Sequence, residues 1–106
     1  MSSFIPINSD EALKLIEAGA LIADIRDPGS FEQGHIKGAL PLNNENLQQF
    51  IDDTEFDKPI IVCCYHGVSS QSAAAFLCER GFEQVFSLNG GFEGWALGMP
   101  EHVDRA

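Results

Sequence analysis

Short apolar runs alternate along the chain with segments whose apolar residues recur at helical spacing. Nearly uniform apolar runs at residues 20–25 and 60–64 are typical of strands that are buried on both faces of a parallel sheet. The second run, Ile60 to Cys64, is the richest in β-branched residues, so we predict that it forms the central strand. Weaker strand patterns lie at residues 4–7, 39–42 and 84–88.

The segment after the first strand pattern carries the start and stop signals of a helix. Asn8 or Ser9 is expected to cap it, because Asp10 and Glu11 in the first turn favour the positive end of the helix dipole. Gly19 is expected to end it.

A longer helix is expected from about Ser69 to Arg80, with Ser69 or Ser70 as its N-cap and Gly81 as its end. Shorter helical segments are expected at residues 30–33, 45–50 and 92–97. This alternation of strands and helices predicts a single α/β domain over residues 1–106. We expect a central, mostly parallel sheet of about five strands that is flanked by helices and joined by right-handed crossovers.

The chain is strongly acidic, since sixteen Asp and Glu residues against six Lys and Arg give its 106 residues a formal net charge of −10. A field of this sign repels phosphate backbones and anionic lipid headgroups, so we expect neither nucleic acid nor a membrane surface as a partner. The apolar stretches fall far short of the roughly 18 residues that span a bilayer. No basic segment leads into an apolar one at the amino terminus, so a cleaved secretion signal is not expected.

Three cysteines, two of them adjacent, do not form the even set that a disulfide framework needs. They suit a reducing compartment, and we expect a cytoplasmic protein. Neighbouring residues of a strand point to opposite faces, so Cys63 is expected to pack in the core, away from Cys64. Cys78 is expected to pack within its helix. Because the three histidines show no ligand spacing, no metal site is expected.

Cys64 stands at the carboxyl end of the predicted central strand, where open α/β sheets bind their ligands. A helix amino terminus lowers the pKa of a nearby thiol from about 8.5 toward roughly 3.5 to 7.5. The loop that follows consists of Tyr65, His66, Gly67, Val68 and Ser69. Its backbone N–H groups can converge on one anion if Gly67 takes a positive φ. We therefore predict that Cys64 is a nucleophile and that this loop binds its substrate.

Two charged side chains near this loop have alternative interpretations. His66 is either a cation beside the thiolate or a surface residue, since histidine titrates near neutral pH. Arg26 has Asp24, Asp27 and Glu32 close to it in the sequence. This environment favours a structural ion-pair cluster over a substrate clamp.

Three blocks of residues carry a resemblance over nearly the whole chain. They are Asp24-Ile25-Arg26 with Phe31 and Gly34-His35-Ile36-Lys37-Gly38-Ala39, then Cys64-Tyr65-His66-Gly67-Val68-Ser69, then Leu88-Asn89-Gly90-Gly91-Phe92-Glu93-Gly94-Trp95. In these residues and in their order the chain resembles the rhodanese homology domain family. It is most similar to the family's short single-domain thiosulfate sulfurtransferases.

The resemblance implies a double-displacement reaction in which Cys64 takes the outer sulfur of thiosulfate, releases sulfite and carries a persulfide. Cyanide or a dithiol such as reduced thioredoxin then removes that sulfur, and no cofactor is needed. Many family members have an arginine or lysine in the loop, whereas this loop has no permanent cation, so we expect weak capture of thiosulfate.

Two other functions are compatible with parts of the pattern. The first is a persulfide sulfur carrier or regulatory module with little turnover of its own. The second is a phosphatase, whose related loop is one residue longer and ends in arginine. The sixth residue after Cys64 is Ser70 and not arginine, which disfavours the phosphatase.

Overall fold

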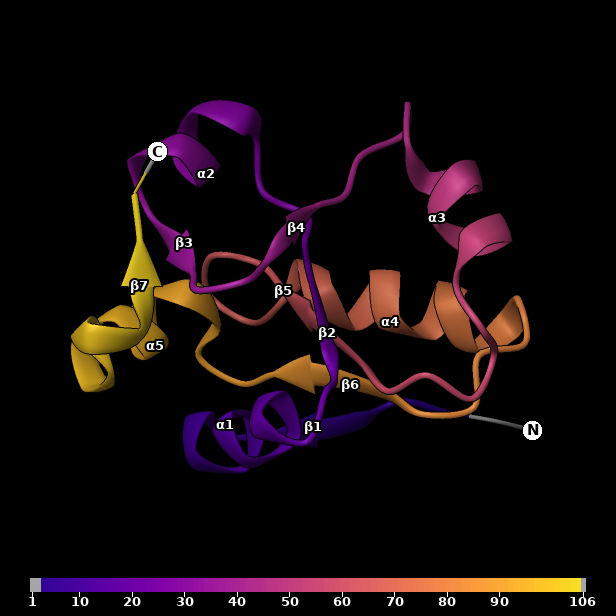
Figure 1. Cartoon of the computed structure of the whole chain (residues 1–106), viewed down its shortest axis with the longest axis horizontal. Coiled ribbons are helices and arrows are strands. Elements are labelled where there is room, and N and C mark those ends of the chain that lie inside the picture. Colours follow the sequence, from indigo (N-terminus) through magenta and orange to yellow (C-terminus); the bar gives the residue numbers. More distant parts are fainter. Residues whose placement is uncertain (1–2, 106) are drawn as a thin grey trace.

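The computed structural model describes residues 3–105 and contains a five-stranded parallel sheet (Figure 1). From edge to edge the strands are β1 (Ile5–Ile7), β6 (Val85–Leu88), β5 (Ile60–Cys63), β2 (Leu21–Asp24) and β4 (Leu40–Pro41). The most β-branched run of the sequence is thus the central strand, as predicted. The predicted α/β class and the number of strands in the main sheet are confirmed.

Helices cover both faces of the sheet. They are α1 (Ser9–Glu17), α2 (Pro28–Gln33), α3 (Leu47–Asp53), α4 (Ser69–Glu79) and α5 (Gly91–Gly98). Ala12 of α1 and Trp95 of α5 share one apolar core with Ile61 of β5. The opposite core contains Val62 of β5 and Leu77 of α4, together with residues of α3. Because side chains alternate along a strand, the residue two positions after Val62 faces the α4 side.

The helix α1 begins at a pair of reciprocal hydrogen bonds between side chains and backbone. Asn8 Oδ1 accepts a hydrogen bond from the Glu11 N–H at 2.8 Å, and Glu11 Oε1 accepts one from the Asn8 N–H at 3.0 Å. This capping box satisfies two N–H groups that have no partner within the helix. Of the two caps that the sequence allowed, Asn8 is therefore the one used.

A second, smaller sheet lies outside the predicted elements. In it β3 (His35–Ile36) pairs antiparallel with β7 (Val103–Asp104), which follows the 3₁₀ turn η1 (Pro100–His102). The indole N–H of Trp95 donates to the His102 carbonyl at 3.2 Å and ties this carboxyl-terminal segment to α5. The strand β4 is equally short but lies in the apolar run at residues 39–42, whereas neither β3 nor β7 lies in such a run, so sequence reasoning missed them.

Within residues 3–105 no helix is both long enough and apolar enough to cross a membrane.

Candidate active site

Cys64 directly follows β5, and the loop of residues 64–68 carries the chain from there into α4. Its sulfur accepts two backbone hydrogen bonds, from the Gly67 N–H at 3.0 Å and from the Ser70 N–H at 3.3 Å. The residue is only 5% exposed. We call residues 64–68 the cysteine loop, and the N–H groups that surround the sulfur the amide cradle.

The amino terminus of α5 holds the cysteine loop in this shape. The Phe92 N–H donates to the Cys64 carbonyl at 2.8 Å, and the Glu93 N–H donates to the Tyr65 carbonyl at 3.0 Å. These two N–H groups belong to the first turn of α5 and have no partner within that helix. The carbonyls of Cys64 and Tyr65 thus face α5, whereas the N–H groups of Gly67 and Ser70 face the sulfur.

Two glycines allow the cysteine loop and the start of α5 to approach each other this closely. Gly67 has φ +92°, and a Cβ on it would lie 2.8 Å from the Gly90 nitrogen. Gly91 has φ +57°, and its Cβ would lie 2.5 Å from the carbonyl oxygens of Cys64 and Tyr65. The positive φ predicted for Gly67 is confirmed, and the space that surrounds it excludes a side chain as well.

The predicted N-cap of α4 is wrong. The N-cap residue is Val68, and no side chain caps the helix. The N–H of Ser70 instead donates to the Cys64 sulfur, so the sulfur replaces the serine hydroxyl as acceptor at this helix end. Ser70 was considered as a cap and as the residue that stands where a phosphatase loop has arginine, but its role as a hydrogen-bond donor to the sulfur was missed. Its position six residues after the cysteine was the available signal.

These hydrogen bonds favour the ionised form of Cys64. Burial opposes charge on the sulfur, but hydrogen bonds from the Ser70 hydroxyl and N–H and from the Gly67 and His66 N–H groups outweigh it and lower the pKa of Cys64. The thiolate, which is the nucleophilic form, therefore persists to lower pH than in an ordinary cysteine.

The neighbouring cysteine has the opposite character. Cys63 is fully buried in the core on the other side of β5, as predicted, and its thiol donates to the Cys64 carbonyl at 3.4 Å. Burial raises the pKa of Cys63 far above its usual range, and the nearby Asp24 carboxylate raises it further. Burial also raises the pKa of Cys78, which packs in the α4-side core as expected. All three thiols are free, but only that of Cys64 is activated.

Most of the other side chains of the predicted site point into solvent. Tyr65 is 49% exposed and Val68 is 71% exposed, and Ser69 is exposed at the start of α4. His66 is also exposed, and its Nδ1 lies 3.0 Å from Glu93 Oε1. The Glu93 contact was not foreseen, because it joins two segments that are far apart in the sequence.

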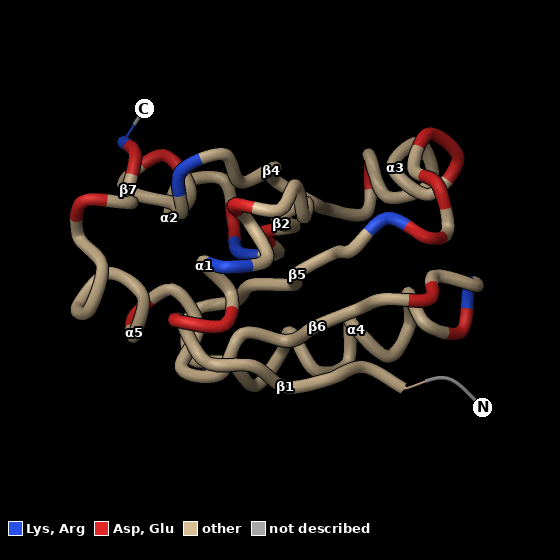
Figure 2. Tube along the Cα trace, turned by 60° about the horizontal axis from the view of Figure 1, so that its bottom comes forward, with Lys and Arg blue, Asp and Glu red and all other residues tan. Residues whose placement is uncertain are grey.

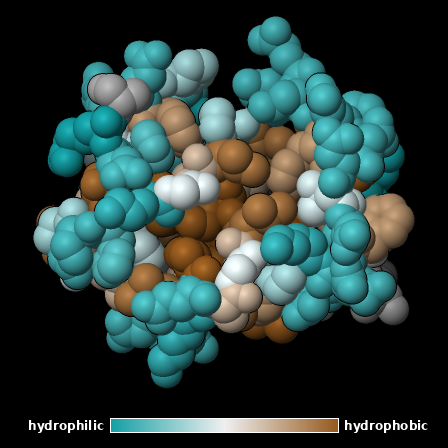
Figure 3. Space-filling view, in the orientation of Figure 1, coloured by the Kyte–Doolittle hydropathy of each residue, from teal (hydrophilic) through white to brown (hydrophobic). Residues whose placement is uncertain are grey.

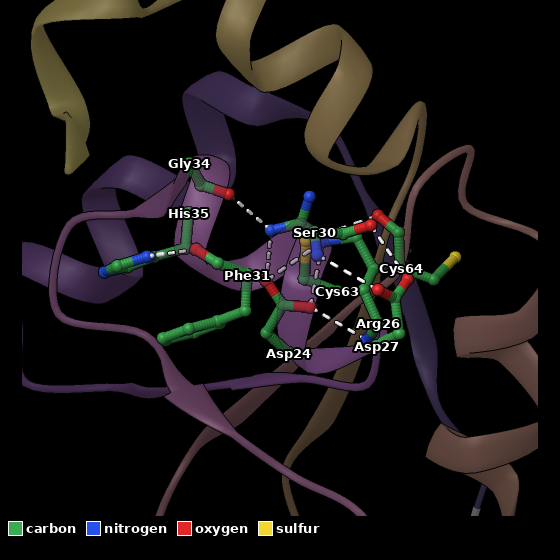
Figure 4. Close-up of polar contacts among 9 residues, drawn as sticks. All are labelled: Asp24, Arg26, Asp27, Ser30, Phe31, Gly34, His35, Cys63 and Cys64. Atoms are coloured by element: carbon green, nitrogen blue, oxygen red, sulfur yellow. Dashed lines mark hydrogen bonds and ion pairs between the residues drawn. The ribbon is translucent and has the colours of Figure 1, made fainter. Parts of the chain in front are cut away.

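Arg26 is part of the scaffold, as the structural interpretation predicted (Figure 4). Its guanidinium donates to both carboxylate oxygens of Asp24 and, through Nη2, to the Gly34 carbonyl at 2.7 Å. It also lies over the Phe92 ring, 4.2 Å from the centroid. The side chains of Arg26 and Asp24 are 6% and 0% exposed. In Figure 4 the Cys64 side chain points away from this ion pair.

The strands and the helix next to Cys64 carry few charged residues. Figure 2 shows that Asp, Glu, Lys and Arg concentrate in loops and at helix ends and leave β5, β6 and most of α4 free of them. Within residues 3–105 no group of three or more His, Cys, Asp or Glu side chains is placed to hold a metal ion.

A groove of about 640 Å³ opens on the α4 side of the sheet. Its walls include Ile25, Leu42, Ala73 and Leu77. The Ile25 N–H donates to the Cys63 carbonyl, so the groove begins beside the end of β5. Figure 3 shows apolar side chains gathered at the centre of the face seen in Figure 1, bordered by hydrophilic ones.

The fold and this site define an α/β protein with a cysteine sulfur, surrounded by backbone N–H groups, at the carboxyl edge of a parallel sheet. Residues 8–97 match the Rhodanese-like domain family. This chain belongs to that family.

Two bacterial relatives are named thiosulfate sulfurtransferase GlpE. The protein from Shewanella oneidensis is 52% identical over 96 residues, which cover 90% of this chain and 95% of the relative. The protein from Pseudoalteromonas translucida is 47% identical over 104 residues, which cover 97% of this chain and 99% of the relative. The solution structure of a rhodanese-like domain from Anabaena is 27% identical and superposes with a TM-score of 0.80, covering 100% of this chain and 81% of that one.

We expect Gly67→Ala to reduce the reaction of Cys64 with iodoacetamide by at least about tenfold at neutral pH, because its Cβ displaces the loop and the amide cradle. Gly38→Ala is the matched control, since Gly38 also has a positive φ, +87°, but its Cβ would meet nothing within 4 Å. Mass-mapped alkylation rates measure the effect. Equal rates in the two variants would contradict the steric argument.

Asp24→Asn is expected to lower the free energy of unfolding by about 3 to 5 kcal/mol, because it leaves the buried Arg26 without a charged partner. Urea denaturation measures this. Asp27→Asn serves as the control: Asp27 is exposed and caps α2, and asparagine caps a helix nearly as well. If the free energy of unfolding falls by the same small amount in both variants, the ion pair does not stabilise the fold as proposed.

Proposed function

We propose that this chain is a thiosulfate sulfurtransferase whose nucleophile is Cys64. The thiolate attacks the outer sulfur of thiosulfate, a new S–S bond forms, and the bond between the two sulfurs of thiosulfate breaks. Sulfite leaves with that bonding pair, and Cys64 carries a persulfide with a negative terminal sulfur. The charge of the two reactants, one thiolate and one dianion, equals that of the persulfide anion and sulfite. The GlpE names of relatives near 50% identity support this reaction.

The amide cradle is the observation that carries the proposal. It places N–H donors of Gly67 and Ser70 around one sulfur, at the amino terminus of a helix. Hydrogen bonds to an ionised acceptor are roughly twice as strong as neutral ones. The same donors that stabilise the thiolate are suited to the anionic terminal sulfur of a persulfide, which extends from the same position.

The exposed side chains of the cysteine loop and of Ser69 follow Cys64 directly in the chain and are proposed to contact the substrate. They are Tyr65, His66, Val68 and Ser69. None is a permanent cation, so a dianionic donor relies on backbone N–H groups and on the helix terminus. Glu93 lies beside His66 and adds a negative charge next to the cysteine loop. Weak capture of thiosulfate follows from this electrostatic environment.

In the second step a thiophilic acceptor attacks the terminal sulfur, and Cys64 leaves as a thiolate. We propose cyanide or a dithiol such as reduced thioredoxin as the acceptor, in the cytoplasm, where three free thiols stay reduced. With cyanide the persulfide anion and the cyanide anion give thiocyanate and the thiolate. A lowered pKa of Cys64 favours this departure, because less basic thiols leave faster.

Intact-mass measurement after thiosulfate treatment tests the covalent step without any acceptor. We expect the native chain to gain one sulfur atom, mapped to Cys64, and to lose it when cyanide is added, with one thiocyanate formed. Cys64→Ser is expected to gain none, and Cys63→Ser is the matched control that keeps the adduct. A sulfur adduct on Cys63 or Cys78, or full thiocyanate formation by Cys64→Ser, would overturn the proposal.

A further inference from the structure

Two serines form a buried polar pair behind the reactive sulfur. Ser70 lies in the first turn of α4 and Ser87 lies on β6, and both are 0% exposed. Their hydroxyl oxygens are 2.8 Å apart. We call them the serine pair. Buried hydroxyl groups are costly unless they are hydrogen-bonded, so this contact satisfies a requirement of the fold.

The position of the serine pair connects the sheet to the sulfur. Ser87 is in register with Val62 on the neighbouring strand β5, two residues before Cys64. Ser70 is the residue whose N–H donates to the Cys64 sulfur. The pair therefore links a side chain of β6, through the first turn of α4, to the atom that reacts.

The direction of the hydrogen bond within the serine pair determines what its protons can do. Each hydroxyl has one proton. If Ser87 donates to Ser70, the Ser70 proton is free to point at the Cys64 sulfur. If Ser70 donates to Ser87, the Ser70 proton is used in that bond and cannot form a hydrogen bond with the sulfur. Only the first direction ends on a negative charge, where a hydrogen bond is strongest.

We propose that Ser87 is a positioning residue, which donates to Ser70 and so fixes the Ser70 hydroxyl as a donor to Cys64. The chain of two hydroxyl groups stabilises the thiolate before sulfur is taken up and when it departs. This inference deepens the proposed sulfur transfer and rests on it for its biological role. Ser70 is already held against the sulfur, because its N–H donates to Cys64 at 3.3 Å, and its hydroxyl is 2.8 Å from that of Ser87. The Ser70 side chain also contributes to the lowered pKa of Cys64, although burial opposes it.

The dependence of Cys64 alkylation on pH tests the chain of hydroxyl groups directly. At a pH below the thiolate midpoint, Ser70→Ala is expected to lower the iodoacetamide rate by about tenfold, because a charge-assisted hydrogen bond is lost. Ser87→Ala is expected to lower it by about threefold, because Ser70 keeps its hydroxyl but loses the donor that orients and polarises it. Both midpoints shift to higher pH, and the rate at high pH stays unchanged.

The double variant separates a chain from two independent effects. If Ser87 acts only through Ser70, the variant with both alanines has the same midpoint as Ser70→Ala. Additive shifts, or an unshifted midpoint in Ser87→Ala, would overturn the proposal. Ser87→Cys, which keeps a weak donor of similar size, is expected to fall between the native chain and Ser87→Ala.

Val85→Ala is the control for a general loosening of β6, because Val85 is buried in the α4-side core on the same strand. We expect it to lower the thermal unfolding midpoint without moving the alkylation midpoint, and an equal pH shift in this variant would also count against the serine pair. The alkylation assay uses no thiosulfate. If the serine variants show the expected shifts but the native chain gains no sulfur from thiosulfate, the proposed function is wrong and this inference still holds.

Discussion

The site depends on one set of backbone contacts, in which the first N–H groups of α5 bind the carbonyls of Cys64 and Tyr65. In a planar trans peptide the C=O and the following N–H point in opposite directions, so the Tyr65 carbonyl that α5 holds leaves the His66 N–H on the side of the sulfur. Further along the chain, the Gly67 and Ser70 N–H groups also donate to the Cys64 sulfur. Two helix amino termini thus act on one residue, that of α5 on its carbonyl and that of α4 on its sulfur.

This arrangement explains how adjacent cysteines acquire opposite chemistry. Both lie at the end of β5, but Cys63 faces a closed apolar core and Cys64 faces the free N–H groups of α4. Burial raises the pKa of Cys63, whereas hydrogen bonds overcome burial and lower that of Cys64. Arg26, which the sequence left as an alternative substrate clamp, is instead paired with Asp24. Hydrogen bonds from N–H groups and from Ser70, and not this arginine, favour the anionic form of the Cys64 sulfur.

Local patterns predicted much of this molecule, because strand composition, turn glycines and the end of a buried strand are readable along the chain. They identified the central strand, the nucleophile candidate Cys64 and the positive φ of Gly67. Contacts between distant segments escaped them. Three such contacts join residues that no local pattern brings together: α5 with the cysteine loop, Ser70 with Ser87, and β3 with β7. The donor role of Ser70 was missed because serine is also a preferred helix cap.

The most direct measurement of the amide cradle is a pH titration of backbone ¹H–¹⁵N resonances by NMR. If the cradle binds the anionic sulfur, the amide signals of Gly67 and Ser70 titrate together, with a midpoint below the roughly 8.5 of a free cysteine, and both titrations vanish in Cys64→Ser. They also shift when thiosulfate converts the thiolate to a persulfide. Amide signals of Gly67 and Ser70 that ignore the ionisation of Cys64, or a midpoint at or above that of a free cysteine, would contradict the account.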